Sequence, residues 1–412
     1  MSRTARVLVG LAAGAVIGLL LTAWHPALAL EVANVAQPVG KLWLNALQMT
    51  VVPLVLALVV IGVNTATDAA ASGRIARRAI VVFIVLLIVG ALFTALAAPW
   101  VFRLFPHNPT LAAALDHAAV LPAAQVAPVG WIDALVAIVP SNAVMAAAQS
   151  AMLPLVVFAL FLGFALTQVM PARRIMLVEF FQAIADAMIV IVGWVLWAAP
   201  LGVFALILSV CARAGLGMLS ALGVYVLTEC LMYLSVALMM LPVAVFFGGE
   251  RVRRFVAALL PAQVVAVSTQ SSLASLPAML DSADRKLGYP APVTALVLPM
   301  AVSLFRLTSP VQYMTSAAFI AWAYGIDLTA AQLITGALLA VVISLGSVGL
   351  PGAVTFIATN LPVAQSMGLP LGPLGLMLAV DTLPDTLATL GNVTADLTAT
   401  SVVAHQSRRD TA

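Results

Sequence analysis

Charged side chains are what this sequence most lacks. Asp, Glu, Lys and Arg make up 8% of its 412 residues, while hydrophobic residues make up 64%. Soluble domains carry about 25% charged residues, so a water-soluble globular fold is excluded. Apolar runs of about 20 residues recur along the chain, each long enough to cross a bilayer. Because lipid cannot satisfy open backbone groups, they predict an all-α membrane protein that contacts lipid and binds no nucleic acid.

Cysteine and histidine are also scarce. Cys211 and Cys230 both lie in apolar runs, which favours small core residues over a disulfide scaffold or a metal site. The four histidines are scattered in loops or near helix ends, so we expect no metal centre and no cofactor. An intramembrane aspartyl protease would need a Gly-x-Gly-Asp stretch and a Tyr-Asp pair, and the sequence contains neither. The protein is therefore not expected to be an enzyme.

The few basic residues predict the topology. Most of them form clusters at Arg3/Arg6, Arg74/Arg77/Arg78, Arg173/Arg174, Arg251/Arg253/Arg254, Arg285/Lys286 and Arg408/Arg409. Cytoplasmic loops are enriched in Lys and Arg, so successive clusters should be separated by an even number of crossings. We therefore predict eight transmembrane helices with both termini in the cytoplasm. Their expected ranges are 5–24, 40–64, 78–105, 139–168, 175–212, 218–247, 290–324 and 371–405.

Two further apolar stretches, 253–281 and 329–366, are interrupted by Ser, Gly and Pro. The first lies between two basic clusters, so it must enter the membrane and return. The second must do the same from the opposite side. Two opposed re-entrant hairpins indicate inverted repeats with a site near the midplane, the plan of many secondary transporters.

Both hairpins carry residues suited to a binding site. The first reads STQSS over 268–272, and the start of a half-helix there offers N–H donors to an anion. A Ser-rich packing seam between helices would give the same pattern. The second reads GSVGLPG over 346–352, where glycines and a proline break a helix and let backbone approach a ligand. A lid and a simple kink both fit it.

The last predicted span carries the strongest signal of function. At about 100° per residue, one face presents a polar stripe consisting of Asp381, Asp385, Ala388, Thr389, Asn392 and Asp396. Three carboxylates on a membrane helix are costly unless they face a polar interior, which favours a binding site over a buried structural network. Glu229, in the middle of the sixth span, either carries a proton or pairs with another polar group.

These motifs resemble the dicarboxylate/amino acid:cation symporters, which include glutamate and aspartate transporters. The resemblance covers nearly the whole chain. It is carried by MTVVPLVLALVVIGV (49–63), the stretch from 138 to 166, AAPLGVFALI (198–207), SSLASLP, GSVGLPG and, most specifically, GNVTADLTAT (391–400). It implies a homotrimer in the bacterial inner membrane that moves a small amino acid or a dicarboxylate by an elevator mechanism.

The resemblance also implies a division into a fixed scaffold and a moving transport domain. Scaffold helices fall in residues 1–77 and 131–215. The third helix and the loop after it, 78–130, belong with residues 216–412 to the transport domain, which holds both hairpins.

Individual positions match residues with known roles in the family. Asp385 matches the aspartate that holds the substrate's amino group, and Ser272 matches the serine whose amide meets the substrate carboxylate. Asn392 matches an asparagine that contacts both substrate and ion, and Asp396 matches a sodium ligand. The other residues expected to line the substrate site are Gln270, Ser271, Ser309, Leu350, Val354, Ala388 and Thr389.

The seventh span departs from the family pattern. Where relatives have Asn-Met-Asp-Gly-Thr, this chain has FRLTS over 305–309, and a Thr-Ser pair of the third span falls on Leu87 and Ile88. Hard cations need oxygen ligands, so this sodium site should be absent. Asp396 would then be a buried charge without its cation. Arg306 is the candidate internal cation for Asp396; alternatively it pairs with Asp385, binds a substrate carboxylate or is structural.

The same positions bear on substrate and coupling. The arginine that grips acidic side chains in relatives is replaced by Ala388, and a first-hairpin arginine by Gln270. A desolvated carboxylate needs a charged partner, so neutral amino acids are favoured. The sequence predicts a sodium-independent transporter, uncoupled or coupled to protons through Glu229 or Asp385. The alternatives are a sodium- or proton-coupled symporter of dicarboxylates or acidic amino acids, and an anion channel.

Overall fold

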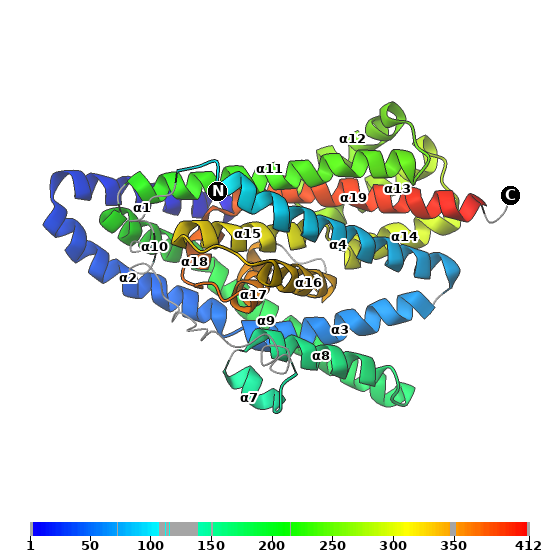
Figure 1. The fold of residues 1–412 in the computed structure, drawn as a ribbon, viewed down its shortest axis with the longest axis horizontal. Helices are drawn as coiled ribbons and strands as arrows, with labels where there is room; N and C mark the ends of the chain where they lie inside the picture. Colours follow the sequence, from blue (N-terminus) through cyan, green and yellow to red (C-terminus); the bar gives the residue numbers. More distant parts are fainter. Residues whose placement is uncertain are drawn as a thin grey trace.

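The computed structural model describes residues 3–71, 73–106, 112, 115, 139–149, 151–214, 216–346 and 352–409, and these contain helices and no strand. The predicted all-α class is confirmed. Six helical segments in the described ranges are long and apolar enough to cross a membrane, and shorter apolar helices accompany them. Figure 1 shows an elongated bundle in which most of the long helices run along the long axis.

The N-terminal quarter forms α1 (Arg3–Trp24), α2 (Pro26–Gln48), α3 (Val51–Ala71) and α4 (Arg74–Phe102). The helix expected over 40–64 is instead divided between α2 and α3, and α2 already begins at Pro26. Residues 26–39 mix polar with apolar side chains, but Ala29 and Ala33 are fully buried. Gly40 is so close to Leu206 that an added Cβ would lie 2.5 Å from it. Small residues let α2 pack closely on the helix that carries Leu206.

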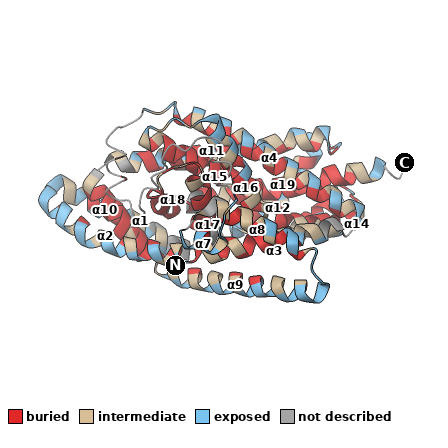
Figure 2. Ribbon diagram, turned by 60° about the horizontal axis from the view of Figure 1, so that its bottom comes forward, coloured by how far each residue is buried: buried red, intermediate tan, exposed pale blue. Residues whose placement is uncertain are grey.

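The next elements are α7 (Ala143–Ala148), α8 (Met152–Leu166), α9 (Pro171–Trp197), α10 (Ala199–Ala214) and α11 (Leu216–Phe246). The fifth predicted span is thus two helices that meet at Ala198. Helix α10 packs against α1 and α2. Figure 2 shows that α9 is largely exposed or half-buried, whereas the helices at the centre of the bundle are mostly buried.

Both predicted hairpins are pairs of helices that pack on each other. The first consists of α12 (Val252–Thr269) and α13 (Ser272–Asp281), followed by the π-helical turn η1 (Ser282–Lys286). The chain reverses at Gln270, which adopts the left-handed conformation with φ 51°. The second consists of α16 (Ala330–Gly346) and α17 (Gly352–Ser366), and its tip, 347–351, lies outside the described residues.

The seventh and eighth predicted spans are each divided in two. The seventh forms α14 (Ala291–Leu304) and α15 (Thr308–Tyr324), and the eighth forms α18 (Leu374–Val380) and α19 (Thr382–Arg409). The break between α14 and α15 contains Arg306. Helix α19 runs alongside α11 in Figure 1 and also packs against α4, α12 and α14.

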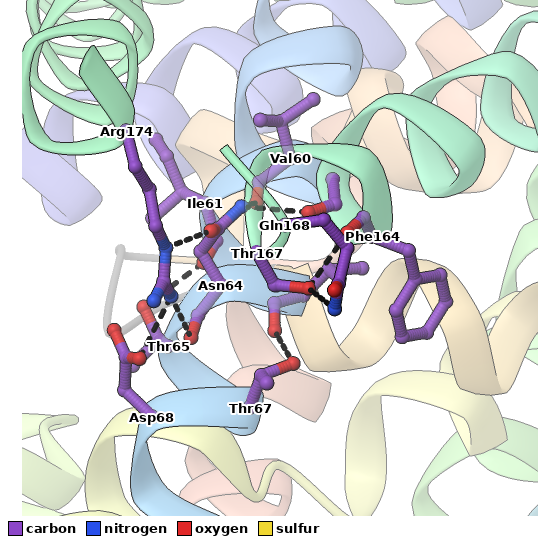
Figure 3. A network of polar contacts seen from close by, with 12 residues as sticks. Val60, Ile61, Asn64, Thr65, Thr67, Asp68, Phe164, Thr167, Gln168 and Arg174 are labelled. Carbon is purple, nitrogen blue, oxygen red and sulfur yellow. Dashed lines mark hydrogen bonds and ion pairs between the residues drawn. The ribbon is translucent and has the colours of Figure 1, made fainter. Parts of the chain in front are cut away.

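A polar cluster joins α3 to α8 and α9 (Figure 3). The Arg174 guanidinium donates to Asn64 Oδ1 at 2.9 Å and to Asp68 Oδ1 at 2.7 Å. Asn64, which is 2% exposed, donates through Nδ2 to the carbonyl of Gly163 at 3.2 Å. Because Asn64 both accepts from α9 and donates to α8, it holds three helices at one point.

We predict that Arg174→Ala destabilises this contact. The variant leaves Asn64 Oδ1 without its donor, which should lower the unfolding free energy by about 1–2 kcal/mol. The ion pair with Asp68 adds little to this loss, because it is exposed to solvent. Thermal unfolding in detergent measures the effect, with Arg173→Ala at the exposed neighbouring position as the control. Equal melting temperatures for the two variants would contradict the prediction.

Candidate functional site

The break between α14 and α15 is held from two sides. Phe305 ends α14 in an extended conformation. The Thr308 N–H, at the start of α15, donates to Asn392 Oδ1 on α19 at 3.0 Å. The Arg306 carbonyl accepts from Ser344 Oγ on α16 at 3.2 Å. The break is thus fixed by side chains of the last helix and of the second hairpin, two elements that sequence patterns linked to binding.

Two side chains at the break between α14 and α15, Phe305 and Leu307, pack in hydrocarbon surroundings. The Phe305 ring stacks on Phe83 of α4 with centroids 4.8 Å apart and planes at 6°. Leu307 is fully buried and so close to Gly90 that an added Cβ would lie 2.9 Å from Leu307 Cδ1. Leu87 is also fully buried, and Ile88 packs against the same core. These five hydrophobic side chains provide no oxygen ligand.

The pairing of Arg306 with Asp396 stays a prediction. Asp396 is fully buried, and neither of its carboxylate oxygens has a hydrogen-bond partner among the described residues. The Arg306 charge nevertheless acts on both Asp385 and Asp396. Asn392, which holds the start of α15, lies one helical turn before Asp396, so the carboxylate is displaced from the break.

The residues of the predicted polar stripe from Asp385 to Asp396 lie in α19, where they make different contacts. Asn392 is 1% exposed, and its Nδ2 is a buried donor with no partner among the described residues. Thr389 Oγ1 donates to the Asp385 carbonyl at 2.9 Å, and Ala388 is 6% exposed. Asp385 is half-buried. The stripe therefore offers a carboxylate and an amide N–H about two turns apart.

The tip of the first hairpin lies beside the polar stripe of α19. Gln270 Nε2 donates to Thr386 Oγ1 on α19 at 2.8 Å. Ser271 caps α13, because its side chain accepts from the Ala274 N–H at 3.2 Å, and Ser272 is the first residue of that helix. The tip thus lies against α19 one residue after Asp385, with the start of a half-helix beside it.

Ser309, Val354 and Leu350 are the remaining residues predicted to line the substrate site. Ser309 is buried, and its N–H donates to the Arg306 carbonyl at 3.0 Å, so it belongs to the same break. Val354 lies in α17, but its side chain is outside the described part. Leu350 is outside the described residues altogether.

A second polar cluster surrounds Glu229 of α11, and most of its members were missed in the sequence. Tyr233 Oη donates to Glu229 Oε1 at 3.0 Å, and Gln312 of α15 donates to Asp381 Oδ1 at 2.8 Å. Tyr225 lies against the same Glu229 carboxyl group. The two tyrosines stand four residues before and after Glu229, a spacing that places all three on one helical face. That spacing could have revealed the cluster.

Comparisons with known proteins agree with these motifs. Residues 4–406 match the sodium:dicarboxylate symporter family. The proton/glutamate-aspartate symporter of Escherichia coli (strain K12) is 32% identical over 378 residues, which cover 90% of this chain and 85% of that protein. The proton/sodium-glutamate symport protein of Bacillus subtilis (strain 168) is 28% identical over 97% of this chain and 91% of that protein. The neutral amino acid transporter B(0) of Oryctolagus cuniculus is 29% identical over 96% of this chain and 79% of that protein.

The stacked ring of Phe305 gives a prediction for the site. Phe305→Ala removes a fully packed aromatic side chain between α4 and the helix break, so it should cost about 3 kcal/mol of stability. Thermal unfolding in detergent measures the loss, with the exposed Phe161→Ala as the matched control. An unchanged melting temperature for Phe305→Ala would show that the ring does not hold the break in place.

Proposed function

Because the chain belongs to the sodium:dicarboxylate symporter family, we propose that it is a sodium-independent transporter of small neutral amino acids. Family membership makes it an integral membrane protein that transports a small molecule and not an enzyme. The absence of sodium coupling and the identity of the substrate are what we propose here. They rest on the residues that replace the family's ion and side-chain ligands.

Sodium independence is supported chiefly by the hydrocarbon around the helix break. A sodium site needs several hard oxygen ligands, whereas Phe305 and Leu307 pack against α4 and provide none. A guanidinium stays protonated at every biological pH. Arg306 can therefore act as a permanent internal cation, because its charge acts on Asp396 and Asp385.

The substrate is proposed from the charges near the α19 stripe. Asp385 would hold the amino group, while Asn392 Nδ2 and the start of α13 at Ser272 would receive the carboxylate. Ala388 carries no charge, and Gln270 already donates to Thr386. An acidic side chain would thus lack a cation at both positions where relatives have one, whereas a small neutral side chain needs none.

The assembly and motion are proposed from the resemblance. We expect a homotrimer in a bacterial inner membrane with both termini in the cytoplasm. Scaffold helices would be α1–α3 and α7–α10, and the elevator would comprise α4 and α11–α19. The packing of α19 against α4, α11, α12 and α14 is compatible with one moving unit.

A cation-coupled symporter of acidic amino acids is the second candidate. It is favoured by the names of the relatives, among them proton/glutamate-aspartate and proton/sodium-glutamate symporters. In that case Arg306 would bind the substrate's second carboxylate in place of the arginine that Ala388 replaces.

Transport by purified protein in liposomes separates the candidates. We expect labelled L-alanine to exchange with internal L-alanine in saturable counterflow at equal rates in sodium and choline buffers. L-glutamate should compete weakly. Strong sodium dependence would refute sodium independence, preference for L-glutamate would favour the second candidate, and non-saturable flux would indicate a channel.

Arg306→Met tests the internal cation. Removing the guanidinium leaves the Asp396 charge uncompensated, so we expect a lower melting temperature and at least about tenfold slower counterflow, equivalent to about 1.4 kcal/mol. Adding Asp396→Asn should recover part of the stability, because no charge then needs compensation. The exposed Arg103→Met is the control. A stable, active Arg306→Met protein would exclude the internal-cation role.

A further inference from the structure

Glu229 and Asp381 are two carboxyl groups buried at one helix interface and not assigned to substrate. Glu229 lies in α11 and is fully buried, and Asp381 lies at the junction of α18 and α19 and is 2% exposed. Gln312 of α15 donates to Asp381 at 2.8 Å and also lies against Glu229. The same amide therefore lies close to both carboxyl groups.

Among the described residues, the side chains that face this pair are tyrosines, a cysteine, a glutamine, a serine and a third carboxyl group. Tyr225, Tyr233 and Cys230 come from α11 itself, and Asp385 comes from α19. Helix α15 adds Gln312 and Ser316, whose hydroxyl lies 3.3 Å from Tyr225 Oη. Charged residues of α4, α10 and α12 lie near the ends of those helices. Within the described ranges, no arginine, lysine or histidine forms an ion pair with Glu229 or Asp381.

Two buried carboxylates without a cation cannot both remain ionised, because their repulsion and desolvation are not compensated. A shared proton removes one charge and turns one carboxyl group into a hydrogen-bond donor. Glu229 Oε2 is a buried oxygen with no hydrogen-bond partner among the described residues, so it is available to carry that proton.

The pair is directly connected to the proposed substrate ligands. The Asp385 N–H donates to the Asp381 carbonyl at 3.0 Å, so the two aspartates are one helical turn apart. Gln312 lies one turn after Thr308, whose N–H is held by Asn392. Loss of the proton would leave two negative charges facing each other across the α11–α19 interface. Their repulsion would move the α18–α19 junction away from α11, and Asp385, one turn later, would move with it. The substrate site would then be complete only when the pair is protonated.

From this geometry we propose that Glu229 and Asp381 form a proton-binding pair that couples amino acid transport to proton movement. The proposal rests on the transport function proposed above. One O–H bond forms on the pair with a proton from water on the side where substrate binds. The same bond breaks when the pair is exposed on the other side, and the proton leaves to water there. Because substrate binding requires the protonated pair, protonation and substrate binding favour each other.

The test uses the purified full chain in liposomes that contain a trapped pH-sensitive dye. With acid outside, we expect labelled L-alanine to accumulate in wild-type vesicles and their interior to acidify with it. Glu229→Gln should lose both, down to the level of protein-free vesicles, because a carboxamide cannot release the proton. Counterflow at equal pH should survive at a reduced rate, since exchange needs no net proton transfer. Glu179→Gln, on exposed α9, is the matched control.

The outcomes separate this proposal from the transport function. Wild-type protein that shows counterflow but no proton movement would overturn the pair's role and leave the transporter intact. Wild-type protein without counterflow of L-alanine or L-glutamate would overturn the function itself. Glu229→Gln with wild-type proton movement would also overturn the pair's role. If Glu229→Gln does not fold, Asp381→Asn decides in the same assay, because it must lose acidification while Glu179→Gln retains it.

Discussion

The hydrogen bond from the Thr308 N–H to Asn392 Oδ1 is the constraint on which the rest of the site depends. A helix broken inside a membrane leaves backbone groups that lipid cannot satisfy, so the break between α14 and α15 exists only because neighbouring side chains complete it. Asn392 satisfies an N–H at the start of α15, and Ser344 donates to the carbonyl of Arg306. Through these contacts the break, the last helix and the second hairpin have a fixed arrangement around the predicted substrate residues.

Charge balance divides this interior into two parts. Around Asp385 and Asp396, the permanent charge of Arg306 is the proposed compensation, and hydrocarbon from Phe305 and Leu307 packs at the same helix break. Around Glu229 and Asp381 no cation of the described chain forms an ion pair, so a proton is the remaining compensation. A fixed cation in one part and a titratable pair in the other would replace sodium coupling by proton coupling within one fold.

The parts of the fold that could be predicted follow from lipid as a solvent. Runs of apolar residues, clusters of arginine and interruptions by Ser, Gly and Pro predicted the helices and both hairpins, because the bilayer penalises every polar group that is left open. Helix ends were less predictable. The extent of α2 depends on Ala29, Ala33 and Gly40 packing against α10, and hydropathy along one segment contains no information about its neighbour.

The polar face from Asp381 to Asp396, the uncharged residues Ala388 and Gln270, and the FRLTS stretch over 305–309 could be identified from the sequence. Residue type and helical period are local properties. Which of these groups are in contact depends on the tertiary structure. In the fold, the Asp396 oxygens have no hydrogen-bond partner among the described residues, Asn392 accepts from the Thr308 N–H, and Gln312 donates to Asp381. These contacts join helices distant in sequence, and their distances depend on how close the helices approach, which the side chains of the whole interface determine together.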